Sequence, residues 1–184
     1  MKMIDHSLIH VSAIALHRGE EPVIGGTNGV CNVFFSGCNL QCIYCQNFQI
    51  SRHCARNTVM PASEAIAAAV DDDTRAIFCE SISNPGGYIT DLDAVAAVAE
   101  RVGLPLIVDN TLASPYLCRP IAHGATLVVH SATKYLTGNG TVTGGVIVDS
   151  GKFDWSASGK FPSLSEPEPA YHGLVFHAAL GPMA

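Results

Sequence analysis

The stretch ATLVVHSATKYLTGNGTVTGG, residues 125–145, decides how this chain folds. Its apolar residues 127–129 predict a short buried strand, which opens into a polar segment, and glycines crowd the far side. Lys134 therefore stands where a buried strand becomes a loop, close to hydroxyl side chains. A lysine in this setting is suited to attack an aldehyde, and Ser131 and Thr133 are free to hold a phosphate.

Upstream of this stretch, helical and strand patterns alternate. The expected helices cover residues 62–70, 91–101 and 116–123, and the expected strands cover residues 75–80, 106–109, 126–130 and 144–149. Ser63 and Asp91 are the expected N-caps of the first two helices. The last strand should be antiparallel, because its connection is too short for a crossover. The alternation predicts an α/β fold with a mainly parallel sheet covered on both faces.

Polar side chains stand at or just beyond the predicted carboxyl ends of these strands, where ligands of such sheets gather. Lys134, Asp109 and Asn84 have this position, as do the hydroxyls of Ser131 and Thr133. Pyridoxal 5′-phosphate needs a lysine for its aldehyde, a carboxylate for its pyridine nitrogen and hydroxyls for its phosphate. Asn84 would bond the 3-oxygen of the ring. Taken singly, each residue also has an ordinary explanation as a turn residue, a loop hydroxyl or a solvated side chain.

Three segments of the chain carry a family resemblance. FCESISNPGG (78–87), PLIVDNTLASPYLCRPIAHGA (105–125) and LVVHSATKYLTGNGTVTGGVIVDSGKFDW (127–155) resemble the Cys/Met-metabolism family of pyridoxal-phosphate enzymes. GKFPSLSEPEPAYHGLVF (159–176) is similar to its O-acetylhomoserine sulfhydrylase branch. The resemblance implies a partial large domain of the PLP fold-type I class over residues 62–184. It also implies that a sulfide or a thiol replaces the acetate of O-acetylhomoserine, in a dimer or tetramer.

The cysteines point to different chemistry. The chain has seven, and four of them fall within residues 31–45. The spacing C-x3-C-x2-C of Cys38, Cys42 and Cys45 brings three thiolates onto one tight loop, which suits three irons of a cubane cluster and leaves the fourth iron open. A zinc site completed by His53 or Cys54, or buried free thiols, would explain the same residues.

The surrounding sequence carries a second resemblance. HRGEEPVIGGTNGVCNVFFSGCNLQCIYCQNFQIS (17–51) resembles the opening of radical S-adenosylmethionine proteins of the pyruvate formate-lyase-activating type. This implies a [4Fe–4S] cluster on the three cysteines, S-adenosylmethionine on the open iron, and Tyr44 near the adenine. We therefore divide the chain into a truncated radical S-adenosylmethionine segment (1–57) and a truncated transferase domain (62–184). A non-catalytic chimera of the two families is the remaining alternative.

Composition limits the kinds of partner. The 184 residues are 48% hydrophobic and 14% charged, which suffices for one ordinary core. The net charge is −6 and the ten Lys and Arg residues are scattered, which argues against nucleic acid. No apolar run approaches the roughly 20 residues that span a bilayer, and the N-terminus lacks a signal-peptide cleavage site. Clustered thiols in such a chain indicate the cytoplasm, and the expected partners are a small amino acid and sulfide.

Overall fold

A computed structural model describes residues 8–18, 29–36, 43–45, 48–51, 56–84 and 87–180 of the chain. The chain forms two compact units, Met1–Thr74 and Arg75–Ala184. The first unit takes in residues 62–70, which lie within the predicted transferase domain (62–184). The proposed domain assignment itself stays a prediction.

The first unit contains an antiparallel sheet in the order β2-β1-β3. Its described elements are β1 (Leu8–His17), β2 (Val30–Phe35), α2 (Phe48–Ser51), β3 (Thr58–Pro61) and α3 (Ala62–Ala69). α3 packs on all three strands, and Val11 and Ala65 are buried. The expected helix is confirmed, but Ser63 is not its N-cap. Pro61 occupies that position with a φ of −61°, and no side-chain hydrogen bond forms there because the proline ring has no hydrogen-bonding group.

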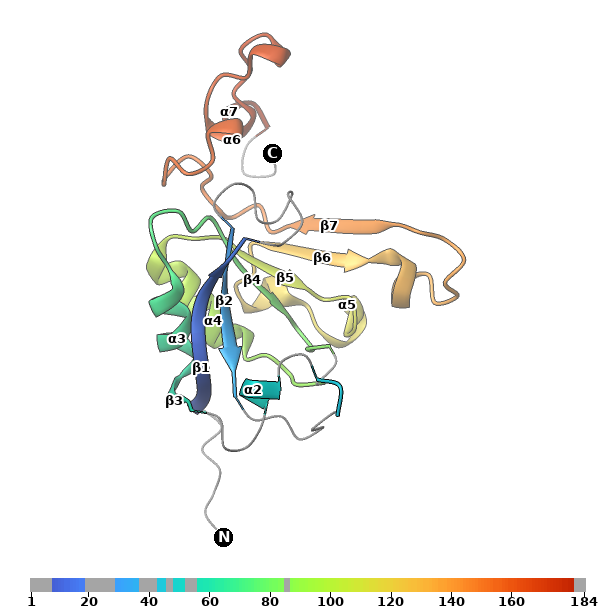
Figure 1. Cartoon of the computed structure of the whole chain (residues 1–184). Helices are drawn as coiled ribbons and strands as arrows, with labels where there is room; N and C mark the ends of the chain where they lie inside the picture. Colours follow the sequence, from blue (N-terminus) through green and yellow to red (C-terminus); the bar gives the residue numbers. More distant parts are fainter. Residues whose placement is uncertain are drawn as a thin grey trace. The chain divides into compact units, whose positions relative to one another are not determined.

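The second unit contains the predicted α/β sheet, in the order β4-β5-β6-β7. The strands are β4 (Ile77–Glu80), β5 (Leu106–Asp109), β6 (Leu127–Ser131) and β7 (Gly145–Asp149). The first three run parallel, and β7 is antiparallel to β6, as their opposed arrows in Figure 1 show. The mainly parallel α/β sheet is therefore confirmed.

Helix α4 (Leu92–Val102) follows its sequence signals closely. Asp91 accepts a hydrogen bond from the backbone N–H of Ala94 at 3.1 Å, which confirms the predicted cap. Gly103 ends the helix with a φ of 65°, a left-handed conformation that favours glycine. The buried face of α4 packs against β5, and Val98 and Leu106 are each only 1% exposed.

Two expectations about this unit are wrong. The helix expected over 116–123 is two short turns, α5 (Ser114–Leu117) and the 3₁₀ turn η1 (Pro120–His123), because Pro120 has no N–H and restricts the residue before it. The sheet is not covered on both faces along its edges. Phe78 on β4 is 62% exposed and Ile147 on β7 is 72% exposed, since each lies on an edge strand.

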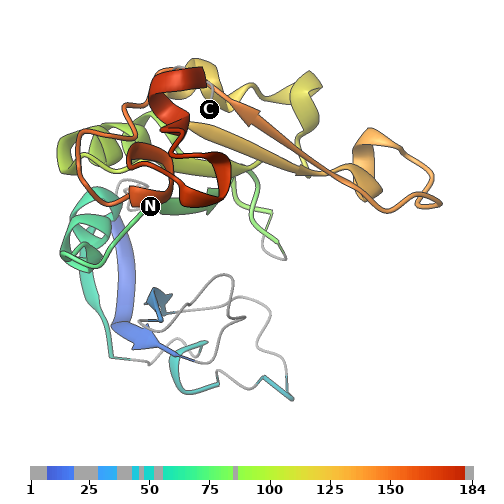
Figure 2. The ribbon, with the colours of Figure 1, turned by 90° about the horizontal axis from the view of Figure 1, so that it is seen from above.

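Short elements complete the second unit. They are the single π-helical turn η2 (Ala132–Leu136), α6 (Pro162–Ser165), η3 (Pro169–Tyr171) and α7 (Phe176–Leu180). In the view from above in Figure 2, the connection from β6 to β7 extends from one end of the sheet. Trp155 is buried and lies edge-to-face against Phe153 and Phe161, at ring-centre distances of 4.9 and 5.1 Å. No helix among the described residues is long and apolar enough to cross a membrane.

Candidate active site

A cavity of about 440 Å³ lies at the carboxyl ends of β4, β5 and β6, within the range of small-molecule sites. It is lined by Glu80, Ile82, Asn84, Asp109, Thr111, Leu112, Ser131, Lys134 and Tyr135. Four residues that the sequence predicts for a cofactor site, Lys134, Asp109, Ser131 and Asn84, are among them. The structure therefore brings together side chains that are far apart in the sequence.

Lys134 comes from the turn that follows β6. This turn has π-helical hydrogen bonds, but Lys134 itself has non-helical angles, with φ at −89° and ψ at −111°. The turn is fastened to the start of β7 by Thr133, whose hydroxyl accepts a hydrogen bond from the Gly144 N–H at 3.0 Å. Thr133 also lies 3.3 Å from the Gly144 carbonyl and does not line the cavity. Its predicted phosphate contact stays a prediction.

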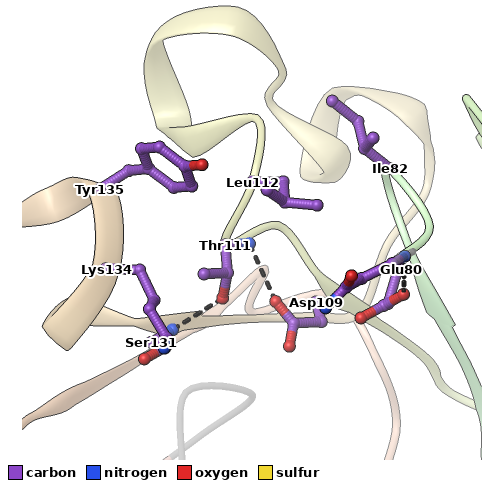
Figure 3. A pocket seen from close by; sticks show the side chains of 9 residues that line it. Glu80, Ile82, Asp109, Thr111, Leu112, Ser131, Lys134 and Tyr135 are labelled. Atoms are coloured by element: carbon purple, nitrogen blue, oxygen red, sulfur yellow. Dashed lines mark hydrogen bonds between the residues drawn. The ribbon is translucent and has the colours of Figure 1, made fainter. Parts of the chain in front are cut away.

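Asp109 ends β5 and is half-buried. Its Oδ1 accepts a hydrogen bond from the Thr111 N–H at 2.8 Å, and its other carboxylate oxygen has no partner among the described residues. Thr111 in turn accepts a hydrogen bond from the Ser131 N–H at 2.8 Å. Figure 3 shows this chain of contacts from the carboxylate to the strand that precedes Lys134. One carboxylate oxygen is thus available to a ligand in the cavity.

Glu80 and Thr111 belong to the cavity but were missed as site residues from the sequence. Glu80 ends β4, and its carboxylate accepts a hydrogen bond from the Asn84 N–H at 2.9 Å. The strand-end rule that identified Asp109 applies equally to Glu80, so the signal was present. Burial, and then the charge of Glu80, raise the pKa of the neighbouring Cys79 thiol to about 11, which keeps this thiol neutral.

The cavity walls above these polar groups are apolar. Figure 3 shows Ile82, Leu112 and Tyr135 on one side, with Lys134 and Ser131 below Tyr135 and Asp109 below Leu112. An amine, a carboxylate with a free oxygen and a hydroxyl thus face a space with apolar walls. This donor set fits pyridoxal phosphate, whose aldehyde, ring nitrogen and phosphate need these three groups.

The predicted cysteine site lies mostly outside the described residues. Cys38 and Cys42 are not described, Cys45 is a half-buried free thiol, and Tyr44 is 87% exposed. Within the described part of the chain, no three His, Cys, Asp or Glu side chains are grouped to hold a metal ion. The iron–sulfur cluster therefore stays a prediction.

Comparison with known proteins identifies the family. The model of the Cys/Met metabolism PLP-dependent enzymes matches residues 20–176, most of the chain. The chain belongs to this family. The resemblance to the Cys/Met-metabolism family is thus confirmed, and pyridoxal phosphate is the cofactor of the family by its description. The match begins before the cysteine motif, and nothing in the comparisons supports a radical S-adenosylmethionine segment.

Several family members are similar to this chain. A sulfhydrylase of Fusarium oxysporum is 55% identical over 121 residues, and a homocysteine synthase of Schizosaccharomyces pombe is 52% identical over 121 residues. Both alignments cover 65% of this chain and 28% of the relative. An O-acetyl-L-homoserine sulfhydrylase of Leptospira meyeri is 49% identical over 118 residues, covering 64% of this chain and 26% of the relative. The chain thus spans less than a third of the length of these relatives.

A solved structure supports the fold assignment. A Campylobacter jejuni protein assigned as an O-acetylhomoserine (thiol)-lyase matches with a TM-score of 0.59 and 33% identity, over 62% of this chain and 28% of that one. Its crystal contains a pyridoxyl-lysine phosphate. The α/β sheet of the second unit is therefore that of the family.

Proposed function

We propose that this chain holds pyridoxal 5′-phosphate through Lys134 and carries part of the active site of an O-acetylhomoserine sulfhydrylase. The observation that supports this most directly is the shared cavity of Lys134, Asp109 and Ser131 at the strand ends. The names of two relatives, a homocysteine synthase and an O-acetyl-L-homoserine sulfhydrylase, support the following reaction. O-acetylhomoserine and sulfide would become homocysteine and acetate.

Each residue of the cavity has a distinct task in this proposal. The cofactor, when bound, withdraws electrons from the substrate amino acid, so that protons leave its carbons more readily. Asp109 would hold the ring nitrogen with its free carboxylate oxygen, and Ser131 would donate its hydroxyl to the phosphate, with Thr133 as a further hydroxyl near the same turn. Lys134 Nζ would carry protons to and from the α and β carbons while acetate leaves the γ carbon.

Further parts of the proposal rest on the relatives and on composition. A cytoplasmic location is proposed from the clustered cysteines of the sequence, and among the described residues Cys31, Cys45, Cys79 and Cys118 are free thiols. Sulfide as the acceptor and assembly into a homo-oligomer come from the family resemblance. Asn84, at the cavity beside Glu80, would contact the 3-oxygen of the cofactor ring.

Borohydride trapping tests this proposal. The 184-residue chain is mixed with pyridoxal phosphate and reduced, and the peptides are sequenced by mass spectrometry. We expect the pyridoxyl mass on Lys134, its loss in Lys134→Ala, and its persistence in Lys152→Ala, since Lys152 is an exposed lysine outside the cavity. An adduct of equal yield in Lys134→Ala would refute the assignment. Homocysteine formation from O-acetylhomoserine and sulfide is then measured on the same samples.

The cysteine motif supports a second, independent proposal for the first unit. The spacing of Cys38, Cys42 and Cys45 would hold a [4Fe–4S] cluster, and an S-adenosylmethionine bound there would lie near the exposed ring of Tyr44. Anaerobic reconstitution should then give about four irons per chain, as one cubane cluster requires. Equal iron retention by the variant with all three cysteines changed to Ala would remove this proposal and leave the cofactor site of the second unit unaffected.

A further inference from the structure

Asn110, the residue after Asp109, is fully buried and uses every hydrogen-bonding group of its side-chain amide. Its Oδ1 accepts a hydrogen bond from the Ser81 hydroxyl at 2.7 Å. Its Nδ2 donates to the carbonyl of Ser114 at 3.1 Å and to the carbonyl of Cys118 at 2.9 Å. One side chain therefore ties the residue after β4 to both ends of the α5 turn.

The backbone around Asn110 repeats these connections. The Asn110 N–H donates to the Val129 carbonyl on β6 at 2.9 Å, and the Ser81 N–H donates to the Asp109 carbonyl at 2.9 Å. The Ser114 N–H donates to the Asn110 carbonyl at 2.9 Å. Asp109 thus stands at a point where three parallel strands are fastened together just below the cavity.

Ser114 shows that this arrangement holds the chain against its own preference. Its φ of 57° lies in the left-handed region, which a serine adopts only where its surroundings fix it. Both of its backbone groups are bonded to Asn110, one to the backbone and one to the side chain. Strained backbone of this kind is common at functional sites, and Ser114 lies in the same loop as Thr111 and Leu112, which line the cavity.

We infer that Asn110 is a positioning residue for the cofactor site, acting through Asp109. Its amide fixes the loop 111–118, and with it the Thr111 N–H that holds one oxygen of the Asp109 carboxylate. Ser81 assists by holding the amide in one orientation. This inference rests on the proposed function, because it assigns Asn110 a role toward the group that Asp109 binds.

The test uses the full chain titrated with pyridoxal phosphate, followed by absorbance, with a pH profile of the bound cofactor. Asn110→Ala should weaken the apparent affinity by about tenfold, the lower end of the effect known for partners that orient metal ligands, and should shift the pH profile. Ser81→Ala removes a single hydrogen bond and should change both quantities less, in the same direction. Asn139→Ala, in an exposed loop, should leave both unchanged.

A double variant separates positioning from stability. Ser114→Gly removes the cost of the positive φ, so Asn110→Ala with Ser114→Gly should regain part of the lost melting temperature. We expect its affinity and pH profile to stay impaired. If affinity recovers with the melting temperature, Asn110 acts through stability alone and the inference is wrong. If Asn110→Ala does not fold, Ser81→Ala serves as the test variant. The inference is then wrong if Ser81→Ala and Asn139→Ala have the same affinity and pH profile.

Failure of the proposed function gives a different result. In that case neither the unchanged chain nor Asn139→Ala yields a borohydride-fixed adduct on Lys134, and both the proposed function and the inference about Asn110 are wrong. If both capture the cofactor and Asn110→Ala equals Asn139→Ala in affinity and pH profile, the inference about Asn110 alone is wrong. Hydrogen exchange of residues 109–118 without cofactor should also be faster in Asn110→Ala than in Asn139→Ala.

Discussion

Gly124 should be far more sensitive to substitution than Gly103, although both have positive φ angles. Gly124 has a φ of 88°, and a Cβ added there would lie 2.7 Å from the Cβ of Ala96 on α4. Gly103 has a φ of 65°, and an added Cβ would meet no atom within 4 Å. Alanine at either position should lower the free energy of unfolding by about 1–2 kcal/mol, because a residue with a Cβ is disfavoured in the left-handed region. At Gly124 it also forces α4 and η1 apart, and overpacking of this kind costs about 1–3 kcal/mol.

The double variant isolates the steric part of this difference. Ala96→Gly alone should cost about 1 kcal/mol, because glycine is that much less favourable than alanine within a helix. Combined with Gly124→Ala it removes the clashing Cβ, so the two changes together should cost less than their sum by about 1–3 kcal/mol. Gly124→Ala is thus measured with and without Ala96→Gly, so the φ at position 124 is common to both measurements. The small difference in φ between Gly103 and Gly124 therefore does not affect this result.

Urea unfolding followed by tryptophan fluorescence is the appropriate assay. The chain has one tryptophan, Trp155, which is buried in the second unit and so reports on the unit that contains Gly124. The midpoints and slopes give the free energies of unfolding. Equal losses for Gly103→Ala and Gly124→Ala, or additive losses for Ala96→Gly and Gly124→Ala, would refute the reasoning.

Three further predictions concern the same unit. Asp91→Ala should lower the free energy of unfolding by about 1 kcal/mol through loss of the α4 cap, measured by urea unfolding. Because the pKa of Cys79 is raised to about 11, protonation favours the folded state. That contribution to stability is fully present below the pKa of the unfolded chain, near 9, and is lost as the pH rises through 11, so the free energy of unfolding should fall over that range. At pH 8, mass spectrometry should show that Cys79 is alkylated much more slowly than the exposed Cys31. Ile147→Lys should reduce aggregation in light scattering while changing stability by no more than about 0.5 kcal/mol, because β7 is an exposed edge.

The strand ends could be predicted from the sequence because two strong signals coincide there. Short apolar runs mark β5 and β6, and polar residues follow each run: Asp109 directly after the first, and Ser131 and Lys134 within five residues of the second. In a parallel sheet these residues must share one edge, so Asp109 and Lys134 follow from pattern alone. Sequence signals also identify α4, whose Asp91 cap lies where the sequence places it.

What the sequence does not reveal are contacts that depend on distances between segments. Asn110 comes directly after Asp109, the last residue of β5, yet the Asn110 side chain is fully buried whereas Asp109 lines the cavity. The difference arises because Ser81, 29 residues earlier, and the carbonyl of Cys118, eight residues later, lie within hydrogen-bond reach of the Asn110 side chain. The split of the helix expected over 116–123 is another such case, although Pro120 was a local warning.

The position of Lys134 depends on the strand that is not parallel. Residues 127–131 of β6 pair along their whole length with 145–149 of β7, and the lysine lies in the turn at the end of this pairing. Thr133 closes that turn onto Gly144 through its backbone and its hydroxyl. The parallel strands therefore supply Asp109, whereas the antiparallel hairpin sets where the amine stands. These contacts close the hairpin at its base, away from the exposed tip at residues 139–143, so a change confined to the tip should leave the position of the amine unchanged.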